Sequence, residues 1–295
     1  MPVHCRLLID QPWGGGMAAQ QSNSETTIWQ APELGAALLR GRFANFSYDV
    51  HTHDTACFAL LTWGSIRIKM RGSEFVARRG DLYAIGADEP HAGWPVDSHG
   101  WSQRTIYVDL DYLRALVGDE RVSRSVTLAG PIIRDRALCS TLYGVHRCSQ
   151  ERGPALYREE RYLAFAARLL LRHASNTAPP VVVGREDRAV KLARDFLTDH
   201  LDVSVHLTDI ASAAGLPPYR LFRAFNRATG MTPHGFQRQA RVRYAMDLIK
   251  SGLALAEVAA ATGFTDQAHL TRHFRRMMGV TPGSYKLAMR AAIRV

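Results

Sequence analysis

Hydrophobic and polar positions alternate with a period of two from about Ala36 to Leu116. The pattern is clearest in SIRIKMRG, where Ile66, Ile68 and Met70 fall on one face and basic residues fall between them. Such alternation is typical of a half-buried antiparallel strand that ends in a glycine turn. Glycines recur along this region at intervals of about eight residues: Gly64, Gly72, Gly80, Gly86 and Gly93. The pattern predicts a small sandwich or barrel of short strands.

The period changes to that of a helix between about Asp135 and Ala174. ALYREERYLAFAARLLLRHA combines good helix formers with an apolar stripe. The stripe consists of Leu156, Leu163, Ala167 and Leu170. We expect it to pack against the strands, and a dimer helix is the alternative. SNTAPPVVVG then breaks the pattern with small residues and two prolines, which predicts an interdomain linker at 175–186.

The chain after Asp187 has a helical pattern and contains an internal repeat. LTDIASAAGLPPYRLFRAFNRATGMTPHGF aligns with LAEVAAATGFTDQAHLTRHFRRMMGVTPGSY at an offset of 48 residues, which becomes 49 after one insertion. Paired positions share their character: Ile210 with Val258, Gly215 with Gly263, Leu221 with Leu270, Phe225 with Phe274, and Gly230 with Gly279. One helical unit is therefore used twice.

Each copy predicts a short helix, a glycine and a second amphipathic helix. In a helix-turn-helix the glycine adopts the positive φ of the turn, and small alanines let the two helices cross closely. In the second copy Leu270 and Phe274 are expected inward, and Thr265 stands at the expected N-cap. The outer face is left to Gln267, Ala268, Thr271 and Arg272. These residue types read base edges, since Arg pairs with guanine, Gln with adenine, and Thr or Ala contacts the thymine methyl group.

The first copy repeats this arrangement with a different helix start. Its expected outer face carries Tyr219, Arg220 and Arg223. Pro218 suits a first helical turn but Pro217 cannot cap it, so we expect this helix start to be less firmly held. The segment between the units, TPHGFQRQARVRYAMDLIKSG, is predicted to be a linker helix. At about 1.5 Å per residue it could hold the second helices roughly 34 Å apart, about one DNA turn.

The net charge of this 295-residue chain is +10, and most of it lies in the C-terminal part. From Val181 to Val295 there are 17 Lys+Arg against 9 Asp+Glu, a balance of +8. A basic domain favours a polyanionic partner such as nucleic acid. Hydrophobic content of 46% and charged content of 22% are typical of a globular protein, and the length allows two domains.

The number and spacing of the cysteines indicate which cellular compartment suits the protein. Cys5, Cys57, Cys139 and Cys148 form no CxxC pair, so neither a zinc finger nor a disulfide scaffold is indicated. The first 25 residues lack the pattern of a signal peptide, and no run approaches the about 18 apolar residues of a membrane span. We therefore expect a cytoplasmic protein with no membrane partner, whose residues 1–25 are a loose leader.

The last hundred residues resemble the DNA-binding domain of the AraC/XylS family of bacterial transcription regulators, above all in GFTDQAHLTRHFRRMMGVTPGSY. The resemblance implies promoter DNA, RNA polymerase and a small-molecule effector as partners, and a homodimer. By motif position it implies as base readers Tyr219, Arg223, Gln267, Ala268, Thr271 and Arg272. It leaves for phosphate or solvent Arg220, Arg227, His269, Arg275 and Arg276.

In that family the preceding β domain looks like a cupin that senses a small molecule. VHTHDTACFALLTWG keeps the cupin intervals with His51, His53, Cys57 and Gly64, although a cysteine holds the glutamate position. Gly80, Gly86, Asp88 and His91 keep the intervals of the second half, with two identities changed. The first two histidines and the cysteine share parity, so on one unbroken strand all three would project into the barrel, where His91 could join them.

Three alternatives remain open for these residues: a metal site, an effector pocket, or structural histidines. Three imidazoles and a thiolate would suit Zn²⁺ or another transition metal, but we expect no cofactor and favour an effector pocket. Its predicted lining is His51, His53, Cys57, Trp63, Tyr83, His91 and Trp94, with Trp101 and Tyr107 as further aromatic candidates. Asp81 is expected to form a turn.

The sequence predicts an α+β multidomain chain. A cupin-like β-barrel with trailing helices would span 26–174, and an all-α domain of two helix-turn-helix units joined by a linker helix would span 187–295. The predicted function is ligand-responsive, sequence-specific transcription regulation without catalysis. The alternatives are a metal-dependent cupin enzyme or a metal or redox sensor fused to a DNA-binding domain, and a constitutive DNA binder whose cupin only dimerises.

Overall fold

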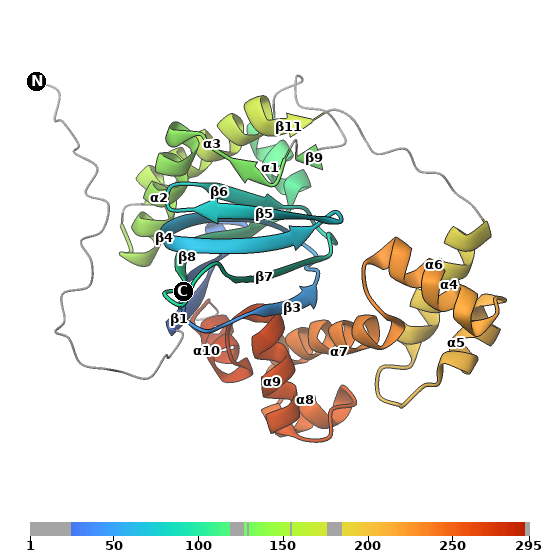
Figure 1. Ribbon diagram of the computed structural model, residues 1–295. Coiled ribbons are helices and arrows are strands. Elements are labelled where there is room, and N and C mark those ends of the chain that lie inside the picture. Colours follow the sequence, from blue (N-terminus) through green and yellow to red (C-terminus); the bar gives the residue numbers. More distant parts are fainter. Residues whose placement is uncertain (1–24, 119–126, 129, 154, 176–184, 293–295) are drawn as a thin grey trace, which may run out of the picture.

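The computed structural model describes residues 25–118, 127–128, 130–153, 155–175 and 185–292. They form a β-rich domain and a helical domain (Figure 1), which confirms the predicted α+β class. Most of the predicted leader and linker lies outside the described residues. Glu25 already belongs to a strand and Arg185 to a helix, so each predicted boundary differs by one or two residues.

The elements have the following bounds. The strands are β1 (Glu25–Ala31), β2 (Ala36–Phe43), β3 (Tyr48–His51), β4 (Ala56–Met70), β5 (Ser73–Arg78), β6 (Leu82–Ile85), β7 (His91–Pro95), β8 (Trp101–Val108), β9 (Thr127–Leu128), β10 (Ile132–Ile133) and β11 (Ala174–Ser175). The helices are α1 (Leu110–Val117), α2 (Arg136–Gln150), α3 (Ala155–His173), α4 (Arg185–Asp199), α5 (Leu207–Ala214), α6 (Pro218–Thr229), α7 (Pro233–Lys250), α8 (Leu255–Ala261), α9 (Gln267–Met278) and α10 (Pro282–Ala292).

The long strand β4 organises the β domain. Its first half pairs with β6 and β8, and its second half pairs with β5 and β7, always antiparallel. The strand passes between these pairings at Gly64, where a Cβ atom would lie 2.1 Å from the carbonyl oxygen of Gly100. Only glycine fits this close approach, so the sequence itself allows one strand to serve both parts of the sheet.

The predicted alternation in β4 is confirmed. Ile66, Ile68 and Met70 are each 2% exposed, whereas Lys69 on the opposite face is exposed. The predicted turn follows at Gly72, which has a φ of 72°. Apolar residues at every second position therefore place one face of the strand in the core.

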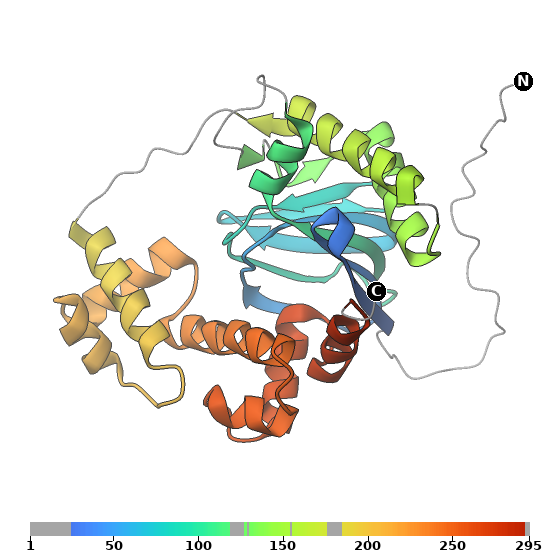
Figure 2. The same cartoon turned by 180° about the vertical axis from the view of Figure 1, so that it is seen from behind.

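Helices α1, α2 and α3 cover one side of the β domain (Figure 2). The buried face of α3 consists of Tyr162, Phe165, Ala166, Leu169 and Leu170. The predicted stripe was wrong for two of its members, because Leu156 is 68% and Leu163 44% exposed. This helix is apolar on more than one face, and Tyr162 and Phe165, together with Leu169 and Leu170, take the buried side in place of Leu156 and Leu163.

The helical domain contains the predicted repeat. Asp209 accepts a hydrogen bond from the backbone N–H of His206, and Glu257 accepts one from that of Ala254, 48 residues further on. The second helices, α6 and α9, each have 12 residues and end at a glycine of positive φ, Gly230 and Gly279. Local sequence therefore fixes both units in the same way.

The two units lie differently relative to the β domain. Helices α4, α5 and α6 form their own core, whereas α9 and α10 lie beside the β domain on the side away from α1–α3 (Figure 1). One buried cluster joins Phe43 and Trp101 of the β domain to Phe274 and Tyr285 of the second unit. Among the described residues no helix is both long enough and apolar enough to cross a membrane.

Candidate DNA-reading face and ligand pocket

Helix α6 presents its predicted residues to solvent. Leu221 and Phe225 are fully buried, and the opposite face exposes Tyr219, Arg220, Arg223 and Arg227. Tyr219 is 72% exposed, and the Arg223 guanidinium lies 5.9 Å from the centre of its ring. Pro217 stands at the N-cap without a side-chain cap, as predicted.

Helix α9 repeats this arrangement. Leu270 and Phe274 are fully buried, and the exposed side chains are Gln267, Ala268, Arg272, Arg275 and Arg276, with Thr271 half-buried beside them. His269, predicted to face phosphate or solvent, is half-buried. Its Nδ1 lies 3.0 Å from the Thr265 hydroxyl, and its ring packs edge-on against Phe264. His269 therefore stabilises the start of its own helix.

The predicted N-cap of α9 was wrong by one residue. Asp266 is the N-cap, and its carboxylate accepts a hydrogen bond of 2.7 Å from the backbone N–H of His269. This hydrogen bond is the main cause of a lowered pKa for the Asp266 carboxyl group. Thr265 instead bonds the His269 ring. Aspartate and threonine are both good N-cap residues. Because Thr265 and Asp266 are adjacent, the sequence alone could not decide which of them caps the helix.

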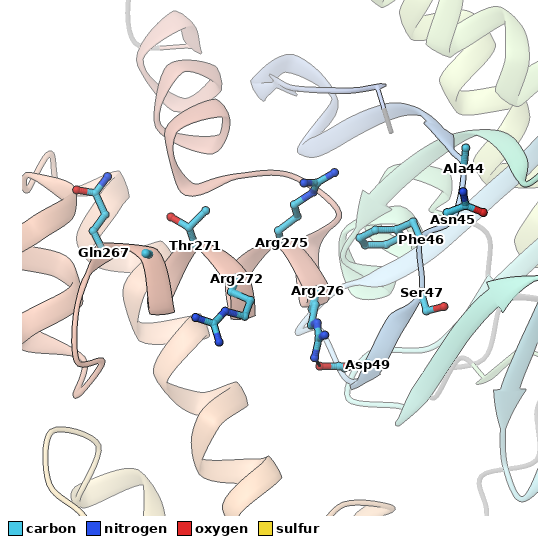
Figure 3. A pocket seen from close by; sticks show the side chains of 11 residues that line it. Ala44, Asn45, Phe46, Ser47, Asp49, Gln267, Thr271, Arg272, Arg275 and Arg276 are labelled. Atoms are coloured by element: carbon cyan, nitrogen blue, oxygen red, sulfur yellow. Dashed lines mark ion pairs between the residues drawn. The ribbon is translucent and has the colours of Figure 1, made fainter. Parts of the chain in front are cut away.

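A groove of about 1000 Å³ separates the outer face of α9 from the 44–49 loop, which comprises the β2–β3 connection and the first two residues of β3. Figure 3 shows Arg276 directed at Asp49 of this loop, with Gln267 at the opposite end of the groove. The two charged groups lie 3.6 Å apart. The β domain thus forms one wall of the space that faces the predicted base readers of α9.

The linker helix α7 holds the β domain through Thr52, which lies just after β3. The backbone N–H of Thr52 donates to Gln239 Oε1 at 3.0 Å, and Gln239 Nε2 donates to the Thr52 carbonyl at 3.3 Å. Arg243, one turn further along α7, donates to the Thr52 hydroxyl at 2.7 Å and to the Asp88 carboxylate at 2.8 Å. Gln239 is 6% exposed, so its hydrogen bonds are formed away from water.

Two glycines at helix ends make close contacts with the β domain. A Cβ atom on Gly279 would lie 2.7 Å from the Tyr48 hydroxyl, and one on Gly230 would lie 3.0 Å from the Pro90 side chain. The interface therefore involves both helix-turn-helix units. Sequence reasoning missed its residues, because neither a glutamine in a helix nor a short loop carries a signal for long-range contact.

A second cavity lies inside the β domain and has a volume of about 30 Å³. Of the predicted residues, it is lined by His51, His53, Cys57, Tyr83, His91 and Tyr107, joined by Gln103 and Tyr48. The predicted reason for this arrangement, a single strand that carries His51, His53 and Cys57, was wrong. β3 ends at His51 and β4 begins at Ala56, so the first two histidines and the cysteine do not share one unbroken strand. His91 is paired with His51 across β3 and β7.

Three predicted aromatic residues lie elsewhere. Trp63 is 39% exposed and stacks under the Arg42 guanidinium. Trp94 pairs with Arg67 in the β4–β7 ladder, and its parity is opposite to that of His91. Trp101 is fully buried and stacks on Phe43, away from the cavity lining. Asp81 forms the predicted turn, since its carboxylate accepts from the backbone N–H of Arg78.

The cavity histidines are neutral. Burial is the largest cause that lowers the pKa of His53 to about 3 and that of His91 to about 4, and the pKa of His51 also lies well below its usual value. Burial raises the pKa of the Cys57 thiol, which is therefore protonated at neutral pH. The cavity thus offers uncharged polar atoms to whatever it binds.

Comparisons with known proteins match both domains. The family model of the AraC-like ligand binding domain matches residues 33–166, and that of a helix-turn-helix domain matches residues 210–288. The uncharacterized HTH-type transcriptional regulator YbfI of Bacillus subtilis is 26% identical over 255 residues, which cover 84% of this chain and 90% of YbfI. The arabinose operon regulatory protein of Escherichia coli is 25% identical over 227 residues, 74% of this chain and 76% of that protein.

A solved structure shows the same fold at low sequence identity. The crystal structure of an apo ToxT variant from Vibrio cholerae superposes with a TM-score of 0.50 at 9% identity, and the match covers 92% of this chain and 100% of that one. It therefore supports the order of a β-rich domain followed by paired helix-turn-helix units.

Proposed function

Because the chain belongs to the AraC family of DNA-binding transcriptional regulators and carries an N-terminal ligand-binding domain, we propose that α6 and α9 read two successive major grooves of a promoter. The observation that carries this proposal is the matched exposure of arginine side chains on two repeated helices, beside Tyr219 in α6 and Gln267 in α9. The 18 residues of α7 give about 27 Å of helix between the units. That length is close to one DNA turn of roughly 34 Å.

We propose further that the β domain controls access to DNA. Its 44–49 loop lines the groove on the reading face of α9, so a duplex that enters this groove has to displace the loop. A ligand that binds the β domain more tightly in the released arrangement would then raise DNA affinity, since only differential affinity for two states shifts their populations. In this arrangement the domain acts as a sensor and not as an enzyme, in the cytoplasm, and presents bound DNA to RNA polymerase.

Binding to the DNA upstream of the protein's own gene tests the proposal. We expect specific binding whose affinity falls steeply with salt, because the domain of net charge +8 neutralises phosphates. With about six phosphate contacts, the affinity would drop roughly 1000-fold between 50 and 200 mM salt. Fluorescence anisotropy with labelled upstream and scrambled duplexes measures both the specificity and the salt dependence of binding. Equal affinity for the two duplexes at every salt concentration would contradict sequence-specific regulation.

We also propose a homodimer formed through α3. The side of α3 that faces away from the sheet exposes Leu156, Tyr157, Leu163 and Leu171. Clustered apolar side chains of this kind mark interaction surfaces. The Leu163→Glu variant should sediment as a monomer at concentrations where the wild type is a dimer, because a charge is costly in a buried interface. The control is Leu287→Glu, which changes another exposed leucine on α10 and should leave the mass unchanged; a dimeric Leu163→Glu variant would contradict this interface.

A further inference from the structure

Three histidines of the β domain meet around its small cavity. His51 ends β3 and His91 begins β7, and the two rings lie 4.2 Å apart between centroids. His53 lies 4.8 Å from His91 by the same measure. One ring nitrogen of each histidine lies within 4.8 Å of the others. Two segments of the chain, 51–53 and the start of β7, therefore bring three nitrogen donors close together.

Backbone hydrogen bonds orient the three rings in the same way. The Nδ1 atom of His51 lies 2.7 Å from the Asp49 carbonyl, that of His53 lies 2.7 Å from the Thr55 carbonyl, and that of His91 lies 2.8 Å from the Glu89 carbonyl. A carbonyl oxygen can only accept, so each Nδ1 carries the proton and each Nε2 keeps a lone pair. Metal-binding histidines are held in this manner, with one nitrogen bonded to a backbone carbonyl and the other free to coordinate.

The size of the cavity decides which kind of ligand fits. Its volume of about 30 Å³ is close to that of one water molecule, whereas drug-sized organic ligands occupy roughly 300–1,000 Å³. An ion with a single bound water fits without opening the domain. An organic effector would have to displace Tyr83, Gln103 or Tyr107 from the wall.

Two charged side chains act on the histidines besides burial. Arg243 lowers the pKa of His51 and of His53, whereas Glu89 raises that of His91. The Arg243 guanidinium is itself paired with the Asp88 carboxylate at 2.8 Å. Cys57 lines the cavity, but its sulfur is not part of the histidine cluster, so the donor set is three imidazoles and not the thiolate-containing set that the sequence suggested.

We propose that His51, His53 and His91 bind one divalent transition-metal ion of the Zn²⁺ type, and that this ion is the ligand sensed by the domain. Imidazole nitrogens suit Zn²⁺, Fe²⁺, Ni²⁺ and Cu²⁺. A three-histidine set leaves a coordination position for water or a small anion, facing the polar wall of Gln103 and Tyr83. The sensing part of this inference depends on the proposed regulatory function, whereas the binding part does not.

Thr52 connects the site to the DNA-binding domain. It lies between His51 and His53, and its backbone is held by Gln239 of α7. Tetrahedral coordination at about 2.0–2.1 Å requires nitrogen donors roughly 3.3 Å apart, and the three donors lie within 4.8 Å of one another. Any adjustment of the histidines on either side of Thr52 to this spacing would act on the hydrogen bonds that dock α7.

Metal content of the tag-free, full-length protein tests the site. After equilibration with Zn²⁺ and desalting, we expect about one bound ion per chain, and Co²⁺ should give the visible absorption of a site with nitrogen ligands. The His53→Gln, His91→Gln double variant should lose more than about 100-fold in affinity. His99→Gln is the control, because His99 is an exposed histidine of the same domain and its loss should change nothing.

DNA binding measured in the same preparations separates the two parts of the proposal. A change in DNA affinity with Zn²⁺ in the wild type and the His99→Gln control, lost in the double variant, supports sensing. Stoichiometric binding with no effect on DNA affinity overturns the sensing part and leaves the metal site. Absence of stoichiometric metal, or equal binding by the double variant, overturns the site even where specific DNA binding is intact.

Discussion

Replacing Arg223 or Arg272 with alanine is expected to lower the affinity for the specific DNA site by about 5- to 150-fold each, which corresponds to roughly 1–3 kcal/mol per bidentate base contact. Both side chains are exposed on the outer faces of α6 and α9. Neither substitution removes core contacts, because the inward positions belong to Leu221 and Phe225 in one helix and to Leu270 and Phe274 in the other. The loss should therefore come from recognition and not from unfolding.

The two substitutions should add, because they lie on separate helices without shared partners. The fold-loss in affinity of the double variant for the specific site should then equal the product of the two single losses. Its affinity for scrambled DNA should fall only as far as the removal of two positive charges near the phosphates requires. Arg79→Ala provides the matched control, since it removes one exposed arginine from the β domain. Equal losses for specific and scrambled DNA would assign both arginines to phosphate contacts.

Helices α6 and α9 could be predicted from the sequence because the residues that define them lie close together in the chain. The glycines, the inward apolar pairs and the polar outer positions recur at a fixed offset, and short-range geometry determines where each side chain points. The alternation in β4 has the same origin, since Ile66, Ile68 and Met70 lie on one face of one continuous strand. The predicted N-cap of α9 was one residue too early, because the backbone angles that distinguish Thr265 from Asp266 cannot be inferred from the sequence.

The pocket was harder to predict because its residues come from several strands. Parity arguments hold within one strand, and the break between β3 and β4 put Cys57 outside the histidine cluster. Trp94 lies outside the pocket because it pairs with Arg67 in the β4–β7 ladder and so lies on the other face of the sheet. No pattern of residues in the sequence specifies which strands pair in this way. The face that α3 buries was similarly undetermined, since leucines occur on both of its sides.

The interface between the domains could not be predicted from the sequence. Gln239 and Arg243 lie in a helix whose apolar residues are spread around its circumference. Their partner Thr52 is 187 positions from Gln239 and 191 positions from Arg243. Hydrogen bonds of this kind depend on how the two domains meet. A ligand can rearrange such contacts where it binds one arrangement of the domains more tightly than another.

Replacing Gln239 with alanine is therefore expected to raise DNA affinity in the absence of ligand. The side chain is buried and forms hydrogen bonds to both backbone groups of Thr52, and a lost buried hydrogen-bond partner costs about 1–3 kcal/mol. The cost falls on the docked arrangement alone, so the population of the released arrangement rises by up to roughly 100-fold. DNA affinity rises by the same factor as long as the docked arrangement predominates.

Gln237 supplies a matched control for this prediction. It lies two residues earlier in α7, is 5% exposed, and donates to the carbonyl of His200 within the helical domain. Gln237→Ala should lower the free energy of unfolding of that domain without loosening the contact with the β domain, so DNA affinity should not rise. Anisotropy titrations of both variants, with thermal unfolding in parallel, distinguish the two effects. An unchanged or lower DNA affinity in a folded Gln239→Ala variant would show that the hydrogen bonds between Gln239 and Thr52 do not restrain α9.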